Sequence, residues 1–247
     1  MNAEFGMMKL FYRARSDTGP VRSLNEDCYV VGGQQPDVAP GLLFVVCDGR
    51  GGLHIGEVAA QQATDTIVTT YYTANDRDPQ PALREAFQAA NQRIYHQWHR
   101  LSTWVTAVAA LVIAEQVTIA NVGDCRAYHF QDRQLRRITA DHTFYEELLH
   151  EGMLTRQEVQ LFASHVTRRR ALGASIELEV DVFQQVLHPD EALLLCTDGL
   201  HDYLEDGEME DILNTAPREE AVDRLIGLVT ARGGRDNLTA ILIWREE

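Results

Sequence analysis

Three short runs with the composition of β-strands follow one another in the middle of the chain, and their spacing constrains the fold more than any other feature. They are Val105–Ile113, Val117–Asn121 and Arg126–Phe130. A crossover between parallel strands needs about a dozen residues or more, whereas only a few residues separate these runs. The spacing therefore predicts an antiparallel meander.

Further strands are expected where continuous apolar runs occur, at Leu42–Cys47, Ala192–Cys196 and Leu238–Trp244. Apolar residues four positions apart predict a helix over Ile55–Tyr72. Asp78-Pro79 offers an N-cap and a first-turn proline to a second helix, which runs to Trp98, a residue expected to pack in the core. The remaining helices are expected at Thr143–Glu151, Thr155–Ala163, Asp206–Asn214 and Pro217–Ala231.

The arrangement of these elements predicts an α+β fold. Antiparallel strands with helices grouped around them bury their apolar faces best when sheet packs on sheet and helices lie outside. We therefore expect a central antiparallel β-sandwich flanked by α-helices on both sides, in four layers. No internal repeat and no linker rich in Pro, Gly or Ser is present, so we expect one domain over residues 1–247.

The chain is acidic, and this excludes some classes of partner. Lys and Arg number 22 and Asp and Glu 37, which gives a net charge of −15. Such a chain is repelled by nucleic-acid phosphates and by anionic lipid, so neither partner is expected. No apolar stretch approaches the ~18 residues that span a bilayer, and the first residues do not resemble a signal peptide. The four widely spaced cysteines are interpreted as free thiols, so a cytoplasmic location is expected.

Two of the apolar runs end in the same dipeptide. Asp48-Gly49 follows Leu42–Cys47, and Asp198-Gly199 follows the run from Ala192. A single Asp-Gly is usually a tight turn, but a carboxylate delivered twice at the end of a buried strand needs something to neutralise it. Asp236, just before the last strand, and Glu26-Asp27 add further acidic groups. Carboxylate and carbonyl oxygens suit Mg²⁺ or Mn²⁺ and do not suit Zn²⁺.

Other catalytic motifs are absent or incomplete. The sequence contains no Gly-x-Ser-x-Gly, and the glycine-rich run that begins at Gly49 lacks the Lys and Ser/Thr of a phosphate-binding loop. Asp76-Arg77-Asp78 does not follow a buried strand, and His201-Asp202 lacks the additional helical histidines of a His-Asp metal site. We interpret these as ordinary surface or turn sequences.

Seven short motifs follow one another along the chain, at Asp17–Asp27, Cys47–Ala59, Asn121–Tyr128, Ile138–Thr143, Arg170–Gly173, Thr197–Asp202 and Gly234–Thr239. Their sequences and their order resemble those of the type 2C metal-dependent serine/threonine protein phosphatases (the PPM family), in their minimal bacterial form. The resemblance extends over residues 11–244.

The resemblance implies a site with two Mn²⁺ or Mg²⁺ ions. It implies that Asp48 bridges both ions and that the Gly49 carbonyl binds one of them. Asp198 and Asp236 would bind the other ion, and Glu26 would act through bound water.

The resemblance also assigns the remaining roles. Asp27 would orient the attacking water, and Arg22 would grip the substrate phosphate. Asp124 and Asp202 match positions linked to a weaker third metal. Ordinary turn residues are the alternative at these two positions, and a solvated arginine is the alternative at Arg22.

Three departures from the family pattern stand out. Arg50 occupies a position where the family often has His or Met, and Arg is a poor proton donor. It could bind phosphate, with metal-bound water protonating the leaving group. Trp104-Val105 replace the usual Gly-Thr, which we expect to change packing and not chemistry. The run Arg168–Arg170 could receive an acidic phosphopeptide or form a solvated basic face.

The predicted function is hydrolysis of phosphoserine and phosphothreonine in proteins by a metal-bridged hydroxide. The expected partners are phosphoprotein substrates and a cognate Ser/Thr kinase whose action the protein opposes, and the expected oligomeric state is a monomer. Two alternatives stay open: a catalytically degenerate phosphoprotein-binding regulator, and a hydrolase of small phosphate esters on the same scaffold.

Overall fold

The computed structural model describes residues 2–5, 8–32, 41–52, 55–74, 78–155 and 170–246. Within them the strands are β1 (Asn2–Phe5), β2 (Met8–Asp17), β3 (Asp27–Gly32), β4 (Leu42–Arg50), β5 (Trp104–Ile113), β6 (Gln116–Val122), β7 (Arg126–Gln131), β8 (Gln134–Arg137), β9 (Asp181–Val186), β10 (Ala192–Cys196) and β11 (Leu238–Glu246). The helices are α1 (Ile55–Thr73), α2 (Pro79–Trp98), the 3₁₀ turn η1 (His99–Leu101), α3 (Phe144–His150), α5 (Asp198–His201), α6 (Asp206–Thr215) and α7 (Arg218–Ala231).

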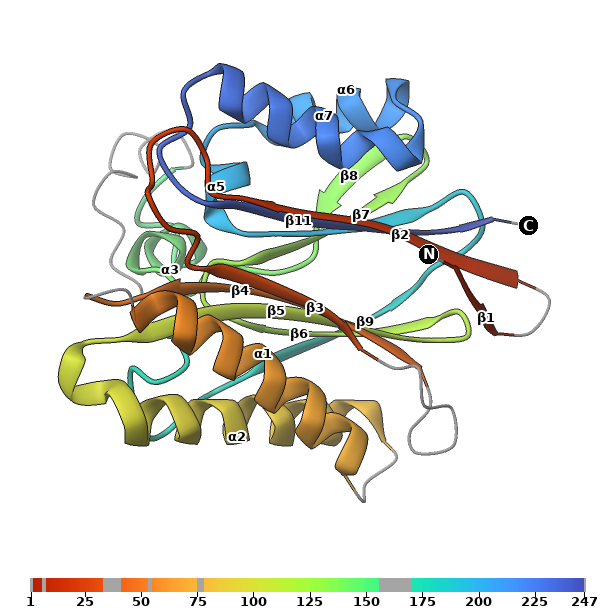
Figure 1. Ribbon diagram of the computed structural model, residues 1–247. Coiled ribbons are helices and arrows are strands. Elements are labelled where there is room, and N and C mark those ends of the chain that lie inside the picture. Colours follow the sequence, from red (N-terminus) through yellow and green to blue (C-terminus); the bar gives the residue numbers. More distant parts are fainter. Residues whose placement is uncertain are drawn as a thin grey trace.

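The strands form two sheets in which every described pairing is antiparallel. One sheet has the order β1-β2-β11-β10-β7-β8, and the other has the order β3-β4-β5-β6-β9. Figure 1 shows the sheets face to face, with α1 and α2 covering the outer face of the second sheet and α6 and α7 covering the first. The predicted α+β sandwich of four layers is confirmed.

Alternation along the strands explains why the layers separate in this way. In β4, Leu43, Val45 and Cys47 pack under the helices, whereas Phe44 and Val46 belong to the core between the sheets. β10 follows the same rule, with alternate leucines on its two faces. A run that is apolar on both faces is the mark of a strand buried between two layers. The sandwich therefore has three apolar cores, one between each pair of layers.

The predicted elements agree with the structure wherever they can be compared. All six predicted strands are present, and the helices predicted at Ile55, Thr143, Asp206 and Pro217 start within one residue of α1, α3, α6 and α7. In α2, the Asp78 side chain accepts the backbone N–H of Gln80, and Trp98 packs against the core as expected. The helix predicted at Thr155–Ala163 lies almost entirely outside the described residues. None of the predicted strands corresponds to β1, β2, β3, β8 or β9.

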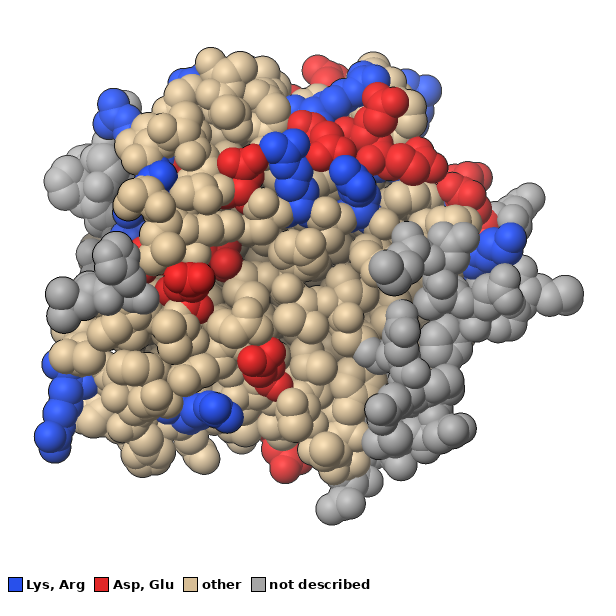
Figure 2. All heavy atoms as spheres, viewed as in Figure 1, with Lys and Arg blue, Asp and Glu red and all other residues tan. Residues whose placement is uncertain are grey.

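The thiols agree with expectation, and surface charges of both signs lie close together on one face. All four cysteines are free, and Cys47, Cys125 and Cys196 are buried. Figure 2 shows acidic and basic side chains interleaved over α7 and β2, where Arg13 pairs with Asp223 at 2.7 Å. The negative charge on this face is therefore spread among cations. Of the helices that the structure describes, none has both the length and the apolar character to cross a bilayer.

Candidate metal centre

All the predicted site residues lie at one end of the sandwich. At this end β4, β6 and β10 finish and β3, β7 and β11 begin, so loops from both sheets meet there. The residues are Arg22, Glu26, Asp27, Asp48, Gly49, Asp124, Asp198, Asp202 and Asp236. Antiparallel topology thus gathers motifs that are far apart in the chain.

Three carboxylates form the centre of this end. One oxygen from each of Asp48, Asp124 and Asp198 lies within 4.8 Å of the others. The exposed fraction is 8% for Asp48 and 4% for Asp124. Like charges this close in a buried setting repel one another unless a cation lies among them. Within the described ranges this is the one such group of acidic, His or Cys side chains, and it places Asp124 directly beside Asp48 and Asp198.

The donor set fits a hard divalent cation. The three side chains offer only carboxylate oxygens, which suit Mg²⁺ or Mn²⁺. The backbone is also packed so closely here that both Asp-Gly pairs require their glycine. A Cβ on Gly49 would lie 2.1 Å from the Gly56 carbonyl oxygen, and one on Gly199 would lie 1.8 Å from the Asn237 carbonyl oxygen. The Asp-Gly pairs are therefore built for close approach of the main chain.

Asp236 lies beside this group and faces two arginines. Its Oδ2 atom is 2.9 Å from Nη2 of Arg22 and 3.6 Å from Arg50. Arg22 also donates through Nε to the carbonyl oxygen of Arg235 at 3.1 Å, although 43% of its side chain is exposed. Arg50 lies over the Trp104 ring, 5.4 Å from its centroid. The two departures from the family pattern, at residues 50 and 104, therefore contact each other.

Asp27 pairs with Asp48 across β3 and β4, and its environment favours the neutral acid. Burial is the main cause, with the charges of Asp198 and Asp236 adding to it, and the pKa of Asp27 rises to about 7 although hydrogen bonds from Thr239 and Thr197 act to lower it. The Thr197 hydroxyl donates to Asp27 Oδ2 at 2.9 Å. This carboxyl can therefore hold or release a proton near neutral pH.

The side chain of Glu26, which precedes β3, is held by the backbone at the start of α1. Burial raises its pKa, while Arg22, Arg50 and a hydrogen bond from the Gly56 backbone N–H oppose the rise. Its own backbone is fixed on both sides. The Glu26 N–H donates to Asn237 Oδ1 at 2.8 Å, and the Glu26 carbonyl accepts the Gly49 N–H at 3.1 Å.

Asn237 organises the loop that carries Arg22, and sequence analysis did not assign it a role. Its side-chain amide donates to the carbonyl oxygens of Thr18 and Leu24, both at 2.9 Å, while its Oδ1 accepts from Glu26. One buried amide therefore ties residues 18–26 to the start of β11. The signal available in the sequence was a polar residue directly between Asp236 and an apolar strand.

Asp202 lies at the edge of the site and is not part of the carboxylate group. It follows Asp198 by one helical turn, and 56% of its side chain is exposed. Its Oδ1 is 3.3 Å from Nδ1 of His201, whose Nε2 is 2.9 Å from the Asp124 carbonyl oxygen. The Asp202 backbone N–H donates to the Asp198 carbonyl oxygen at 2.9 Å, whereas its described side-chain contact is with His201.

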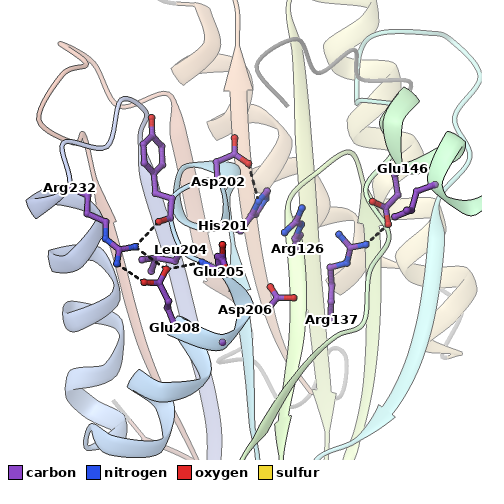
Figure 3. A pocket seen from close by; sticks show the side chains of 13 residues that line it. Arg126, Arg137, Glu146, His201, Asp202, Leu204, Glu205, Asp206, Glu208 and Arg232 are labelled. Carbon is purple, nitrogen blue, oxygen red and sulfur yellow. Dashed lines mark hydrogen bonds and ion pairs between the residues drawn. The ribbon is translucent and has the colours of Figure 1, made fainter. Parts of the chain in front are cut away.

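A cavity of about 670 Å³ opens beside His201 and Asp202. Figure 3 shows Arg126 and Arg137 on one wall and the start of α6, with Glu208, on the other. Its arginines are already paired with carboxylates of the chain itself, as in the contact of Arg232 with Glu208.

Arg170 pairs with Asp181 at 2.8 Å, and the rest of the Arg168–Arg170 run is outside the described residues.

Comparison with known proteins agrees with this architecture. The sequence model of the family described as Protein phosphatase 2C matches residues 20–148. The chain is 34% identical to the serine/threonine phosphatase stp of Listeria welshimeri, over 99% of this chain and 96% of that protein. Stp1 of Staphylococcus aureus has a solved structure with a TM-score of 0.86 and 32% identity, covering 98% of this chain and 97% of that one.

A further match connects the fold to metal. The catalytic domain of the serine/threonine protein phosphatase PstP, solved in complex with 2 manganese ions, superposes with a TM-score of 0.82 at 30% identity, covering 96% of this chain and 99% of that one. The chain is thus an enzyme of the metal-dependent protein phosphatase class. It belongs to the protein phosphatase 2C family and is a serine/threonine protein phosphatase of that type.

Proposed function

We propose that the protein removes phosphate from phosphoserine and phosphothreonine of proteins at a centre that holds two Mn²⁺ or Mg²⁺ ions. The observation that carries the proposal is the approach of Asp48, Asp124 and Asp198 within 4.8 Å. Asp48, the Gly49 carbonyl, Asp198 and Asp236 would hold the ions, with Glu26 acting through water. Asp124 and Asp202 would serve a weaker third position.

When bound, divalent cations lower the pKa of water and stabilise charge on a phosphoryl group. The protein's own residues then have three tasks: to orient water, to bind phosphate and to keep the loops in register. Asp27 suits the first task, because its carboxyl lies opposite Asp48 across β3 and β4 and can accept a hydrogen bond from water. Thr197 fixes the orientation of that carboxyl.

Arg22 suits the second task. It converges with Arg50 on the Asp236 carboxylate, so both guanidinium groups face the same anionic position. A phosphoryl group at this edge would meet two planar, permanently charged donors. Arg50 is braced by Trp104, and this placement supports phosphate binding in preference to proton donation.

Phosphopeptide hydrolysis with added Mn²⁺ tests the proposal directly. We expect turnover of phosphoserine and phosphothreonine peptides that a chelator abolishes and Mn²⁺ restores, with two ions bound in calorimetric titration. Full activity in chelated, metal-free protein would refute the metal mechanism. Phosphopeptide binding without turnover would instead identify a degenerate binding protein, and a preference for small esters over peptides would identify a small-ester hydrolase.

The opposing partner is a Ser/Thr kinase in this proposal, because such an enzyme produces the substrate. A cell that lacks the phosphatase should accumulate phosphoserine and phosphothreonine on proteins that the kinase modifies. Phosphoproteomes would be compared between cells that carry the wild-type protein and cells in which the Asp48→Asn variant replaces it. Identical phosphoproteomes would contradict the prediction.

A further inference from the structure

The loop that carries Asp124 joins β6 to β7. His201 Nε2 lies 2.9 Å from the Asp124 carbonyl oxygen, and residues 140–142 contact the loop before, within and after its turn. The Asn121 amide donates to the Ala140 carbonyl oxygen at 3.3 Å, just before the loop. Just after it, Arg126 binds Asp141 through Nε at 2.9 Å and Nη2 at 2.5 Å. Burial acts to raise the pKa of Asp141, but the charge and hydrogen bonds of Arg126 outweigh it and keep this pKa below its usual value.

His142 holds the loop at its centre, one residue from Asp124. The Gly123 N–H donates to His142 Nδ1 at 3.0 Å, and the His142 N–H donates to the Gly123 carbonyl oxygen, also at 3.0 Å. Gly123 has φ +101°, and a Cβ there would lie 2.3 Å from Thr106 Cγ2. The turn therefore depends on glycine and on the ring that caps it.

The partners of His142 decide which ring nitrogen carries the proton. A backbone N–H can only donate, so Nδ1 must be the acceptor and Nε2 must carry hydrogen. Nε2 lies 3.1 Å from Asp181 Oδ2, and Asp181 also accepts from Arg170 at 2.8 Å. The hydrogen bond with His142 is the main cause that lowers the pKa of Asp181 to about 2, so its carboxylate is ionised at neutral pH.

We propose that His142 is a positioning residue that sets the place of the Asp124 carboxylate. As the Nε2–H tautomer it spans from Asp181 to Gly123 and fixes the turn from which Asp124 reaches toward Asp48 and Asp198. The ring is 3% exposed, so water does not replace either contact. This inference rests on the proposed metal centre, because the effect of His142 is expressed in how well that centre binds a cation.

The same fold contains a matched control. His129 is also a buried histidine, 9% exposed, and its Nε2 lies 3.1 Å from Glu191 Oε2. Like His142, it is a buried histidine whose Nε2 atom lies 3.1 Å from a carboxylate oxygen. It lies near the end of β7 opposite the metal centre, and none of its described contacts reaches the Asp124 loop.

The test compares variants of these two histidines in the full chain. In His142→Asn the side-chain oxygen lies near the former Nδ1 and can still accept from Gly123, whereas in His142→Gln the polar group lies near the former Nε2. Loss of a residue that orients a metal ligand typically reduces metal affinity about 10- to 100-fold. We expect a loss of that size in His142→Gln at the Mn²⁺ position that Asp124 serves, a smaller loss there in His142→Asn, and unchanged affinity in His129→Asn.

A second measurement needs neither metal nor a variant of uncertain folding. Nitrogen NMR of the metal-free wild type should show His142 with hydrogen on Nε2 and a bare Nδ1. The opposite tautomer overturns the proposal, as does a folded His142→Gln protein with wild-type Mn²⁺ affinity. If the wild type itself binds no Mn²⁺, the proposed metal centre fails, and this outcome is distinct from a failure confined to His142.

Discussion

The two ends of the inter-sheet core differ in how their buried carboxylates are surrounded. At the far end, His129 lies against Glu191, and Glu191 also accepts the His188 N–H at 2.8 Å. At the metal end, Asp48, Asp124 and Asp198 approach one another within 4.8 Å. At the far end a single buried carboxylate is hydrogen-bonded within the protein, whereas at the metal end three carboxylates are brought together. The contrast indicates that the metal end is arranged for a ligand at some expense to the stability of the metal-free fold.

Asp48→Asn should break the contrast most strongly. The amide is close in size to the carboxylate but neutral, so the fold should persist. Turnover should fall by more than about a hundredfold, which is the upper end of the loss seen when a residue that only orients a metal ligand is replaced. Removing one of three like charges should leave the melting temperature of the metal-free protein unchanged or raise it. Steady-state kinetics and thermal melts with and without Mn²⁺ check both points. A variant with wild-type kcat and both ions bound would show that Asp48 is not the bridge.

Arg22→Ala should reduce catalysis while leaving the metals in place. A charge-assisted contact with phosphate contributes roughly 1.5–3 kcal/mol, so kcat/KM should fall about ten- to a hundredfold. A rise in KM alone would indicate ground-state binding, and a fall in kcat would indicate transition-state stabilisation. Arg13→Ala is the matched control, since Arg13 also pairs with an aspartate and is similarly exposed, at 48% against 43%. Equal kcat/KM in the two variants would contradict the phosphate-binding role.

Glu191→Gln should affect only the far end. Removing the charge that faces His129 leaves a buried polar group poorly paired, which costs about 1–3 kcal/mol of unfolding free energy. For a chain of this size the melting temperature should fall by about 2–4 °C per kcal/mol. Mn²⁺ affinity and kcat/KM should stay at wild-type values. A parallel loss of Mn²⁺ affinity would show that the two ends are not independent.

Asp181→Asn should give the smallest effect, and it depends on pH. Because the pKa of Asp181 is lowered to about 2 in the folded state, its ionised form adds stability above the unfolded value of about 3.9. That contribution is lost as pH falls from about 4 to about 2. Its size is about 1–2 kcal/mol after allowance for partial exposure. The difference in unfolding free energy between wild type and variant should therefore be clearly smaller at pH 2.5 than at pH 7.

Sequence patterns predicted the buried strands because those strands are apolar on both faces. β4 and β10 are of this kind, whereas β9, with the sequence DVFQQV, and β3 are half exposed and carry polar residues. β2 contains three cationic residues between its apolar ones and was also missed. An apolar run identifies a strand between two layers, but it does not identify the edge of a sheet.

The site was predicted at the level of residue type and not of contact. The Asp-Gly pairs showed where carboxylates leave buried strands. No local pattern showed that Asn237 contacts Thr18, 219 positions away, or that His142 supports the turn before Asp124. Such contacts depend on how the two sheets are stacked, and that information lies outside any single segment. The position of Asp124 beside Asp48 and Asp198 is a result of the same stacking.

The place of β11 in the sheet has a consequence for how the enzyme is made. β11 is the last strand in chain order, yet it lies between β2 and β10 and pairs with both. During synthesis β2 and β10 therefore have no common neighbour until residues 238–246 leave the ribosome. Asp236 and Asn237 emerge just before this strand, so the loop that holds Arg22 is fixed at the same moment. Insertion of β11 between β2 and β10 therefore closes the sheet and, in the same step, brings Asp236 and Asn237 to the end of the sandwich that carries the proposed site.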